Sequence, residues 1–300
     1  MDGLDGGVEP GLEPNVLGEG CMITSLDWNE VWKERMAKSI ESGRGRDCVD
    51  NWSNKHEASN YGRMLEEEDL QSIAPFRDIM ALSSPFAVLD IGAGTGRLAI
   101  PFSRIASRVT AVEPSAQMLE VLNDDLKRHK IENIDCIQKR WEDVEIPTDL
   151  LMKYELVVAS FSLGFLDLRE AVSKMIEASS RYICLMWFAG EPSWDADYRK
   201  LSAALFGKSD YQTMPKSDII FNVLYQMGIY PNIRVFRFEM LHRFTSLDGA
   251  ADYFAGKFNA LSSTQRSVLK DVLPQILEER NGQWILPYRA TNMMLWWEKN

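Results

Sequence analysis

Between residues 86 and 188, short apolar runs alternate with stretches in which apolar residues recur every three or four positions. Short apolar runs are typical of buried strands, and the longer spacing is typical of amphipathic helices. The pattern predicts strands at residues 86–91, 109–112, 134–138, 156–160 and 182–188. It predicts helices between them at residues 97–105, 116–128 and 168–179. Strands that are connected through helices pair in parallel, so both faces of this sheet are expected to be covered.

After residue 190 the simple alternation ends. The spacing of apolar residues predicts helices at residues 194–206, 219–227, 248–261 and 264–279, and strands at residues 233–244 and 289–298. Two strands separated by helices indicate a final strand pair, within residues 228–245 and 285–300, that carries a helical insertion. The expected fold is therefore a three-layer α/β sandwich.

The residues before the first predicted strand divide into two parts. Residues 1–24 are rich in Gly, Pro and acidic side chains and show no apolar periodicity, so we expect a flexible tail. From residue 25 apolar residues recur at helical spacing, and residues 25–84 are expected to form a helical cap at one edge of the sheet. Residues 25–300 are interpreted as one domain, with its core at residues 85–190.

The charge balance excludes one class of partner. The chain has 300 residues, with 33 Lys and Arg against 44 Asp and Glu, and a formal net charge of −11. Nucleic-acid grooves need clustered cations, so no nucleic-acid partner is expected. No apolar run approaches the roughly 20 residues that span a bilayer, and the start lacks a signal-peptide pattern. The four cysteines are far apart, which disfavours a metal site. We expect a cytoplasmic protein without a membrane partner.

A glycine-rich turn follows the first predicted strand and leads into a helix. It reads Gly92-Ala93-Gly94-Thr95-Gly96, and Asp90 precedes it within the strand. Glycine permits positive φ and lets a ligand approach the backbone, close to the free amides of the helix start. The dinucleotide-binding pattern G-x-G-x-x-G requires glycine where this chain has Arg97. Asp90 would repel a pyrophosphate and suits a ligand with an ammonium group; its alternative role is to brace the turn.

An acidic residue, Glu113, ends the second predicted strand. Nucleoside ligands of several kinds use an acid at this position, where it accepts hydrogen bonds from two ribose hydroxyls. Pro114 and Met118 follow it, and their apolar side chains are candidates to hold an adenine ring between them. Met118 also fits the hydrophobic core. These residues indicate a nucleoside without selecting which one.

The loop after the third predicted strand contains Trp141, Glu142 and Asp143. A backbone amide and an acidic side chain at this place are candidates to contact the edge of adenine. The same residues also describe an ordinary helix start, where acids interact favourably with the helix dipole. The adenine role is favoured because the segment comes third in order, after the glycine turn and Glu113.

Taken in this order, the motifs resemble the class I family of S-adenosylmethionine-dependent methyltransferases over residues 50–190. The resemblance implies a seven-stranded, mostly parallel sheet whose last strand is antiparallel, with S-adenosyl-L-methionine as cofactor and S-adenosyl-L-homocysteine as product. It assigns the cofactor contacts to Asp90, Gly92, Ala93, Gly94, Gly96, Glu113, Pro114, Met118, Trp141, Glu142, Asp143 and Phe161. Many members have an aspartate at the position of Arg140, so adenine recognition is left to Trp141, Glu142 and Asp143.

The resemblance implies direct displacement of a methyl group from a sulfonium. Alignment of the reactants can supply about 7–11 kcal/mol in such a reaction, and a general base is needed only when the acceptor loses a proton. The candidate catalytic residues are His56, Tyr61 and Ser162. A single histidine on a helix is more often a solvated surface residue. The aromatic candidates for the acceptor pocket, which also fit the core, are Trp187, Trp194, His242 and Tyr288.

The segment after the fourth predicted strand limits the chemical class of the methyl acceptor. Residues 159–163 read ASFSL, whereas family members that methylate amines of bases or glutamine amides carry an Asn-Pro-Pro-Tyr type motif there. The resemblance therefore favours a small-molecule acceptor beneath helical lids at residues 191–227 and 246–284, in a monomer or homodimer. Three alternatives stay open: a protein or corrinoid acceptor, a binding module without catalysis, and a nicotinamide-dependent oxidoreductase.

Overall fold

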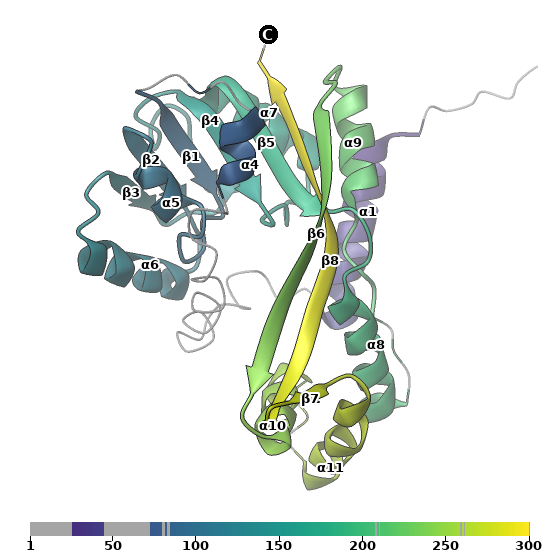
Figure 1. Ribbon diagram of the computed structural model, residues 1–300. Coiled ribbons are helices and arrows are strands. Elements are labelled where there is room, and N and C mark those ends of the chain that lie inside the picture. Colours follow the sequence, from purple (N-terminus) through teal and green to yellow (C-terminus); the bar gives the residue numbers. More distant parts are fainter. Residues whose placement is uncertain are drawn as a thin grey trace, which may run out of the picture.

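The computed structural model describes residues 26–44, 73–79, 82, 85–207, 209, 211–258, 260 and 262–299. Its centre is one sheet in the order β3-β2-β1-β4-β5-β8-β6, and the short strand β7 pairs with β8 (Figure 1). The strands are β1 (Ala87–Ile91), β2 (Arg108–Val112), β3 (Ile134–Ile137), β4 (Tyr154–Ser160), β5 (Ser179–Phe188), β6 (Asn232–Phe244), β7 (Glu278–Arg280) and β8 (Gln283–Glu298). The first five are parallel, and β8 runs antiparallel to β5 and β6. The predicted α/β fold with a reversed last strand is confirmed.

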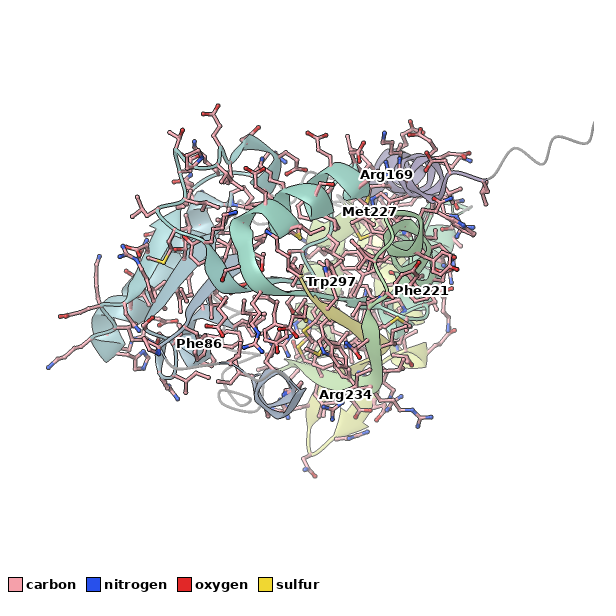
Figure 2. The ribbon with its side chains drawn as sticks, turned by 90° about the horizontal axis from the view of Figure 1, so that it is seen from above. Phe86, Arg169, Phe221, Met227, Arg234 and Trp297 are labelled. Atoms are coloured by element: carbon pink, nitrogen blue, oxygen red, sulfur yellow. The ribbon has the colours of Figure 1, made fainter. Side chains whose placement is uncertain are left out.

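Helices cover both faces of the sheet. They are α1 (Trp28–Ser39), α4 (Ala74–Ile79), α5 (Ala99–Ser103), α6 (Ala116–His129), α7 (Leu168–Ala178), α8 (Ser193–Phe206), α9 (Ser217–Gln226), α10 (Leu247–Phe258) and α11 (Ser263–Val272). One core cluster joins α4, α5 and α6 to one face, and a second joins α1, α7 and α9 to the other. Seen from above, Arg169 of α7 and Met227 at the end of α9 lie beside α1 (Figure 2).

The predicted helix at 264–279 is wrong in its second half. Helix α11 ends at Val272, a 3-10 turn covers Leu273–Gln275, and Glu278–Arg280 form β7. Pro274 explains the end of the helix, because proline lacks the N–H that an α-helix interior requires and its ring clashes with the preceding turn.

The last strand is longer than the predicted 289–298, because β8 begins at Gln283 and contains Pro287. Proline usually argues against a strand interior. Here Ser193 Oγ contacts the carbonyl of Pro287 and accepts the N–H of Arg289, so these backbone groups face α8 rather than β6. The missing N–H of Pro287 therefore costs no hydrogen bond to β6, and the strand continues through it.

Helix α9 does not belong to a lid, so that part of the prediction for residues 191–227 is wrong. Its residues Ile219, Ile220, Val223 and Leu224 are fully buried in the core cluster on the sheet. Apolar residues at this spacing predict that one face of the helix is buried. They do not show whether that face packs against the sheet or over the cavity. Helix α9 is thus part of the layer that supports the sheet.

Strands β6 and β8 continue far past the rest of the sheet. Pairing between β5 and β8 ends at Phe188 opposite Asn292, whereas β6 and β8 pair for eight more positions, to Phe244 opposite Trp284. At about 3.3 Å per residue this extension is roughly 26 Å long. We call residues 237–244 and 284–291 the ribbon. Helices α8, α10 and α11 gather around its end and share a separate apolar core (Figure 1); we call this unit the distal lobe.

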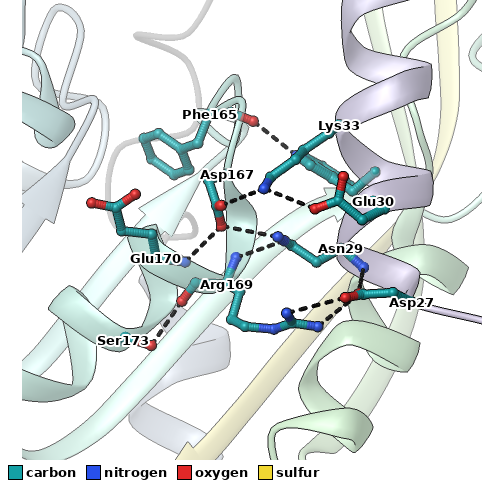
Figure 3. Close-up of polar contacts among 10 residues, drawn as sticks. Asp27, Asn29, Glu30, Lys33, Phe165, Asp167, Arg169, Glu170 and Ser173 are labelled. Atoms are coloured by element: carbon teal, nitrogen blue, oxygen red, sulfur yellow. Dashed lines mark hydrogen bonds and ion pairs between the residues drawn. The ribbon is translucent and has the colours of Figure 1, made fainter.

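Polar contacts fix α1 to the start of α7 (Figure 3). The buried Asn29 donates to Asp167 Oδ1 at 3.0 Å, and its own Oδ1 accepts the backbone N–H of Arg169 at 2.9 Å. Arg169 pairs with Asp27 at 2.7 Å, and the indole N–H of Trp32 donates to the carbonyl of Phe165 at 2.8 Å. Both ends of the Asn29 amide are satisfied, so α1 has a defined register against the domain.

Candidate functional site

A cavity of about 770 Å³ lies at the carboxyl ends of the parallel strands. Ligands of open α/β sheets bind at this edge, and the volume is in the usual range for small-molecule pockets. The predicted site residues that line it are Asp90, Gly92, Ala93, Gly94, Glu113, Pro114, Met118, Trp141, Glu142, Phe161 and Ser162. Gly96 and Asp143 are outside the lining. His56 and Tyr61 lie outside the described residues.

Glu113 is bound directly to the glycine turn. The N–H of Gly94 donates to Glu113 Oε2 and the N–H of Ser115 donates to Oε1, both at 2.9 Å. Each carboxylate oxygen keeps a further lone pair for an added donor. Burial raises the pKa of Glu113, and these two N–H donors oppose the rise. The turn therefore faces Glu113, as a site for a ribose diol requires.

The glycines of the turn serve different purposes. Gly94 has φ +56°, and a Cβ there would meet nothing within 4 Å, so its backbone borders open space. Gly92 has φ +71°, and a Cβ there would lie 2.2 Å from Cβ of Ser162, in the segment after β4. Gly96 faces Leu122 of α6, which explains its absence from the cavity lining. Only Gly94 of these three glycines therefore borders open space, whereas glycine is needed at positions 92 and 96 because Ser162 and Leu122 pack against them.

Asp90 is the most unusual group in the cavity. It is 2 % exposed, and its Oδ2 has no hydrogen-bond partner among the described residues. Burial raises the pKa of Asp90 to about 7; the backbone N–H of Ala99 opposes this, and the Glu113 charge adds to it. A buried acceptor without a donor is costly, because it has lost its water. A ligand that brings a cationic N–H donor would remove that cost.

The segment after β3 differs from the prediction in detail. The indole N–H of Trp141 donates to the carbonyl of Ala171 at 3.1 Å, so this side chain can offer adenine only its ring. Lys174 Nζ donates to the carbonyls of Trp141 and Glu142. Lys139 and Arg140 also line the cavity, although no sequence motif predicted them there. Adjacent cationic and acidic side chains thus make this end of the cavity polar.

The segment after β4 contains a strained residue. Phe161 has φ +54°, a left-handed conformation that is uncommon for a non-glycine residue and costs on the order of 1–3 kcal/mol. Its N–H donates to the carbonyl of Met186 at 3.0 Å, and its ring centroid is 5.1 Å from that of Phe188. Ser162 Oγ donates to the carbonyl of Ile91 at 2.5 Å. The hydroxyl of Ser162 is therefore committed to the β1 backbone and is a poor candidate for a base.

Several lining residues were missed because they come from distant segments. Met36, Ser39 and Ile40 enter from the end of α1, and Met214 enters from the segment before α9. The apolar spacing that located α1 does not reveal which of its residues reach a cavity. Trp187 lines the cavity, whereas Trp194, His242 and Tyr288 do not.

Comparison with known proteins adds independent evidence. Residues 88–181 match the family model described as a methyltransferase domain.

The chain contains a methyltransferase domain.

The methyltransferase domain has relatives of low identity. Ribosomal protein L11 methyltransferase from Lactobacillus gasseri is 24% identical over 208 residues, which cover 65% of this chain and 56% of that protein. The uncharacterized methyltransferase YcgJ from Bacillus subtilis is 27% identical over 108 residues, which cover 35% of this chain and 42% of that protein. The chain thus spans about half the length of the curated relatives that it matches.

A solved structure shares the fold. A crystal structure from Bacillus halodurans, described as a methyltransferase, has a TM-score of 0.53 and 15% sequence identity. The comparison covers 76% of this chain and 99% of that one. It shows that this chain and that structure share the arrangement of the sheet and its helices. In the part of the chain that the structure describes, no helix combines the length and apolar character needed to cross a membrane.

Proposed function

We propose that this protein transfers a methyl group from S-adenosyl-L-methionine to a small-molecule acceptor. The observation that carries the proposal is the pair of buried carboxylates beside the glycine turn, where one oxygen of Asp90 has no hydrogen-bond partner within the part of the chain that the structure describes. The cofactor has an ammonium group and a sulfonium, and both favour a negatively charged surrounding. Asp90, within the strand before the glycine turn, would repel a pyrophosphate ligand, which argues against a nicotinamide cofactor.

Each residue has a role in this proposal. Glu113 accepts hydrogen bonds from the ribose hydroxyls, and Asp90 orients the ammonium group directly or through water. Pro114 and Met118 contact the adenine, and the ring of Trp141 lines the same cavity. Phe161 borders the transferred methyl group. The bound cofactor supplies the activated methyl, and the residues of the chain align the acceptor with it and exclude water.

The volume of the cavity, which is in the usual range for small-molecule pockets, favours a small acceptor over a macromolecule. The net charge of −11 disfavours an RNA acceptor, although some relatives are named as ribosomal RNA methyltransferases. A ribosomal protein remains the alternative that the Lactobacillus gasseri relative suggests. We expect the enzyme to act in the cytoplasm, as a monomer or homodimer.

Calorimetry with the product and with a nucleoside analogue that lacks the amino-acid part tests the proposal. S-adenosylhomocysteine carries the ammonium group, whereas 5′-methylthioadenosine keeps the nucleoside and lacks it. We expect the first to bind at least tenfold more tightly, and we expect Asp90→Asn to reduce that ratio because a charged hydrogen bond contributes about 1.5–3 kcal/mol. Asp218→Asn, at an exposed position of α9, is the matched control. Failure of S-adenosylhomocysteine to bind at millimolar concentration, or tighter binding of NAD, would refute the proposal.

A further inference from the structure

The cavity has two chemically different ends. The sheet order places the segments after β2 and β3 at one end and the segments after β4 and β5 at the other. Four strand spacings of about 4.8 Å separate β3 from β5, or roughly 19 Å. Under the proposed function, the nucleoside occupies the first end and the methyl group lies beside the glycine turn. The β4–β5 end is then left for the acceptor.

The β4–β5 end is lined by apolar and aromatic side chains. They are Met36, Ile40, Phe161, Trp187, Phe188 and Met214. By contrast, the β2–β3 end includes Glu113, Lys139, Arg140 and Glu142. Polar recognition is therefore concentrated on the nucleoside side, and contact with the acceptor is mainly apolar.

Polar atoms at the β4–β5 end already have protein partners. The indole N–H of Trp187 donates to the carbonyl of Pro215 at 2.7 Å, and Ser39 Oγ donates to the carbonyl of Gln212 at 3.2 Å. Ser160 differs, because its hydroxyl lies 3.6 Å from Met186 Sδ, which is a weak acceptor. Ser160 is thus the hydroxyl that can turn to a polar atom of the acceptor.

An unbroken row of aromatic rings begins at this end. Phe161 and Phe188 lie 5.1 Å apart between centroids, Phe188 meets Trp194 at 5.4 Å, and Trp194 meets Tyr288 at 5.5 Å. The last two contacts are edge-on, with interplanar angles of 77° and 73°. Edge-on packing fixes ring orientation, since the positive edge of one ring meets the negative face of the next. The Phe188 ring is thereby held in place from behind.

The backbone conformation of Phe161 adds to this argument. A left-handed conformation is easier for glycine or asparagine than for phenylalanine. The strain persists because the neighbouring contacts hold it, and such strain concentrates at functional sites. Its effect here is to keep an aromatic ring at the end of β4, next to the Phe188 ring.

From these observations, and resting on the proposed function, we infer that the acceptor is a planar aromatic molecule that packs against the Phe161–Phe188 pair. A flat, polarisable ring gains offset or edge-to-face contacts with both side chains. A saturated molecule of similar size gains apolar burial without those contacts. Aromatic pairs contribute about 0.5–1.5 kcal/mol beyond burial, so planarity should raise affinity by about twofold to twelvefold per ring pair.

A matched pair of probes tests the inference. The protein is saturated with S-adenosylhomocysteine, and calorimetry measures binding of 2-naphthol and of decahydro-2-naphthol, which has the same carbon skeleton without the π system. We expect 2-naphthol to bind at least fivefold more tightly. Equal affinities, or no binding of 2-naphthol to the saturated protein, would overturn the inference. Failure of S-adenosylhomocysteine itself to bind would refute the proposed function instead, so the two failures are distinguishable.

Two variants locate the probe. Phe188→Leu keeps an apolar side chain and removes the ring, and Phe161→Gly removes a ring at a position where glycine relieves the strained φ. Both should weaken 2-naphthol binding about fivefold while the affinity of Phe188→Leu for S-adenosylhomocysteine changes less than twofold. Phe206→Leu, on an exposed phenylalanine of α8, should change neither. Unchanged 2-naphthol affinity in both cavity variants contradicts the assigned contact.

Discussion

The parallel part of the sheet and the ribbon differ both in the residues that form their strands and in what surrounds them. Strands β1 and β4 are covered on both faces by helices, and most of their residues are buried. In the ribbon, the β6 residues are half-buried or exposed except for the buried Phe244, and a separate core forms at its far end. Because both faces of the parallel strands are covered, only their carboxyl ends are open to a ligand. The ribbon instead extends past these ends and carries the distal lobe.

The largest expected effect comes from the parallel part. Leu89 in β1 is fully buried between β2 and β4. Leu89→Ala should lower the free energy of unfolding by about 2–5 kcal/mol, because a cavity remains where neighbours cannot collapse. Urea denaturation measures this, with Leu166→Ala, at an exposed position, as the control. A loss below 1 kcal/mol would mean that the core around β1 repacks.

A matched substitution in the distal lobe tests whether the lobe opens independently of the parallel part of the sheet. Leu269 of α11 is fully buried in the core of the lobe. Leu269→Ala should accelerate hydrogen exchange at residues 237–244 by at least about 30-fold, because local opening becomes easier by about 2 kcal/mol or more. Amides at 87–91 should be unaffected. Equal acceleration in both segments would show that the molecule opens as one unit and would remove the contrast.

A smaller effect is expected from Glu113→Ala. The substitution removes the acceptor proposed for the ribose and also the partner of the Gly94 N–H. Affinity for S-adenosylhomocysteine should fall about tenfold to a hundredfold, the equivalent of one charged hydrogen bond. Calorimetry provides the measurement, and Glu132→Ala, at an exposed position outside the cavity lining, provides the control. Unchanged affinity would show that the ribose lies elsewhere.

The smallest expected effect is a pH dependence that originates from Asp90. Its pKa is raised to about 7 in the folded protein, so the folded state binds this proton more tightly than the unfolded chain does. Stability without ligand should therefore fall as pH rises from about 4 to 7. Binding of an ammonium group favours the ionised carboxylate, so ligand affinity should rise over the same interval, by up to about tenfold from pH 5.5 to 7.

Asp90→Asn is the control for this titration. Over that interval the α-amino group of the ligand stays charged, because the pKa of a free amino acid's ammonium group lies well above 7. The variant should bind S-adenosylhomocysteine more weakly and with no slope between pH 5.5 and 7. An unchanged slope in the variant would assign the titration to another group, such as Glu113, whose pKa burial also raises.

The same contrast explains what the sequence could predict. Strands β1 to β5 and their helices follow clear periodicities, and the predicted segments match them closely. In the second half, Pro274 and Pro287 have opposite consequences, since one ends a helix and the other is accommodated in a strand. Only the position of Ser193 against Pro287 separates these cases, and that contact joins residues far apart in sequence.

The candidate site shows a similar division. Asp90, Gly94 and Glu113 were predictable, because strand ends of a parallel sheet meet at one edge. The contributions of Met36 and Met214 were not, because they depend on how α1 and the segment before α9 pack against the domain. The hydrogen bond from the Trp141 indole to the Ala171 carbonyl also depends on tertiary contact, and no local sequence pattern predicts it.

The anchoring of α1 has a consequence for how the cavity wall tolerates change. A helix advances about 1.5 Å and turns about 100° per residue, so a slip of one position would swing Met36 away from the opening. Apolar contacts alone allow several registers between two helices. The Asn29 amide, however, can bond to Asp167 and Arg169 in one register only. Insertions or deletions between Asn29 and Met36 should therefore reshape the wall even when the helix itself survives.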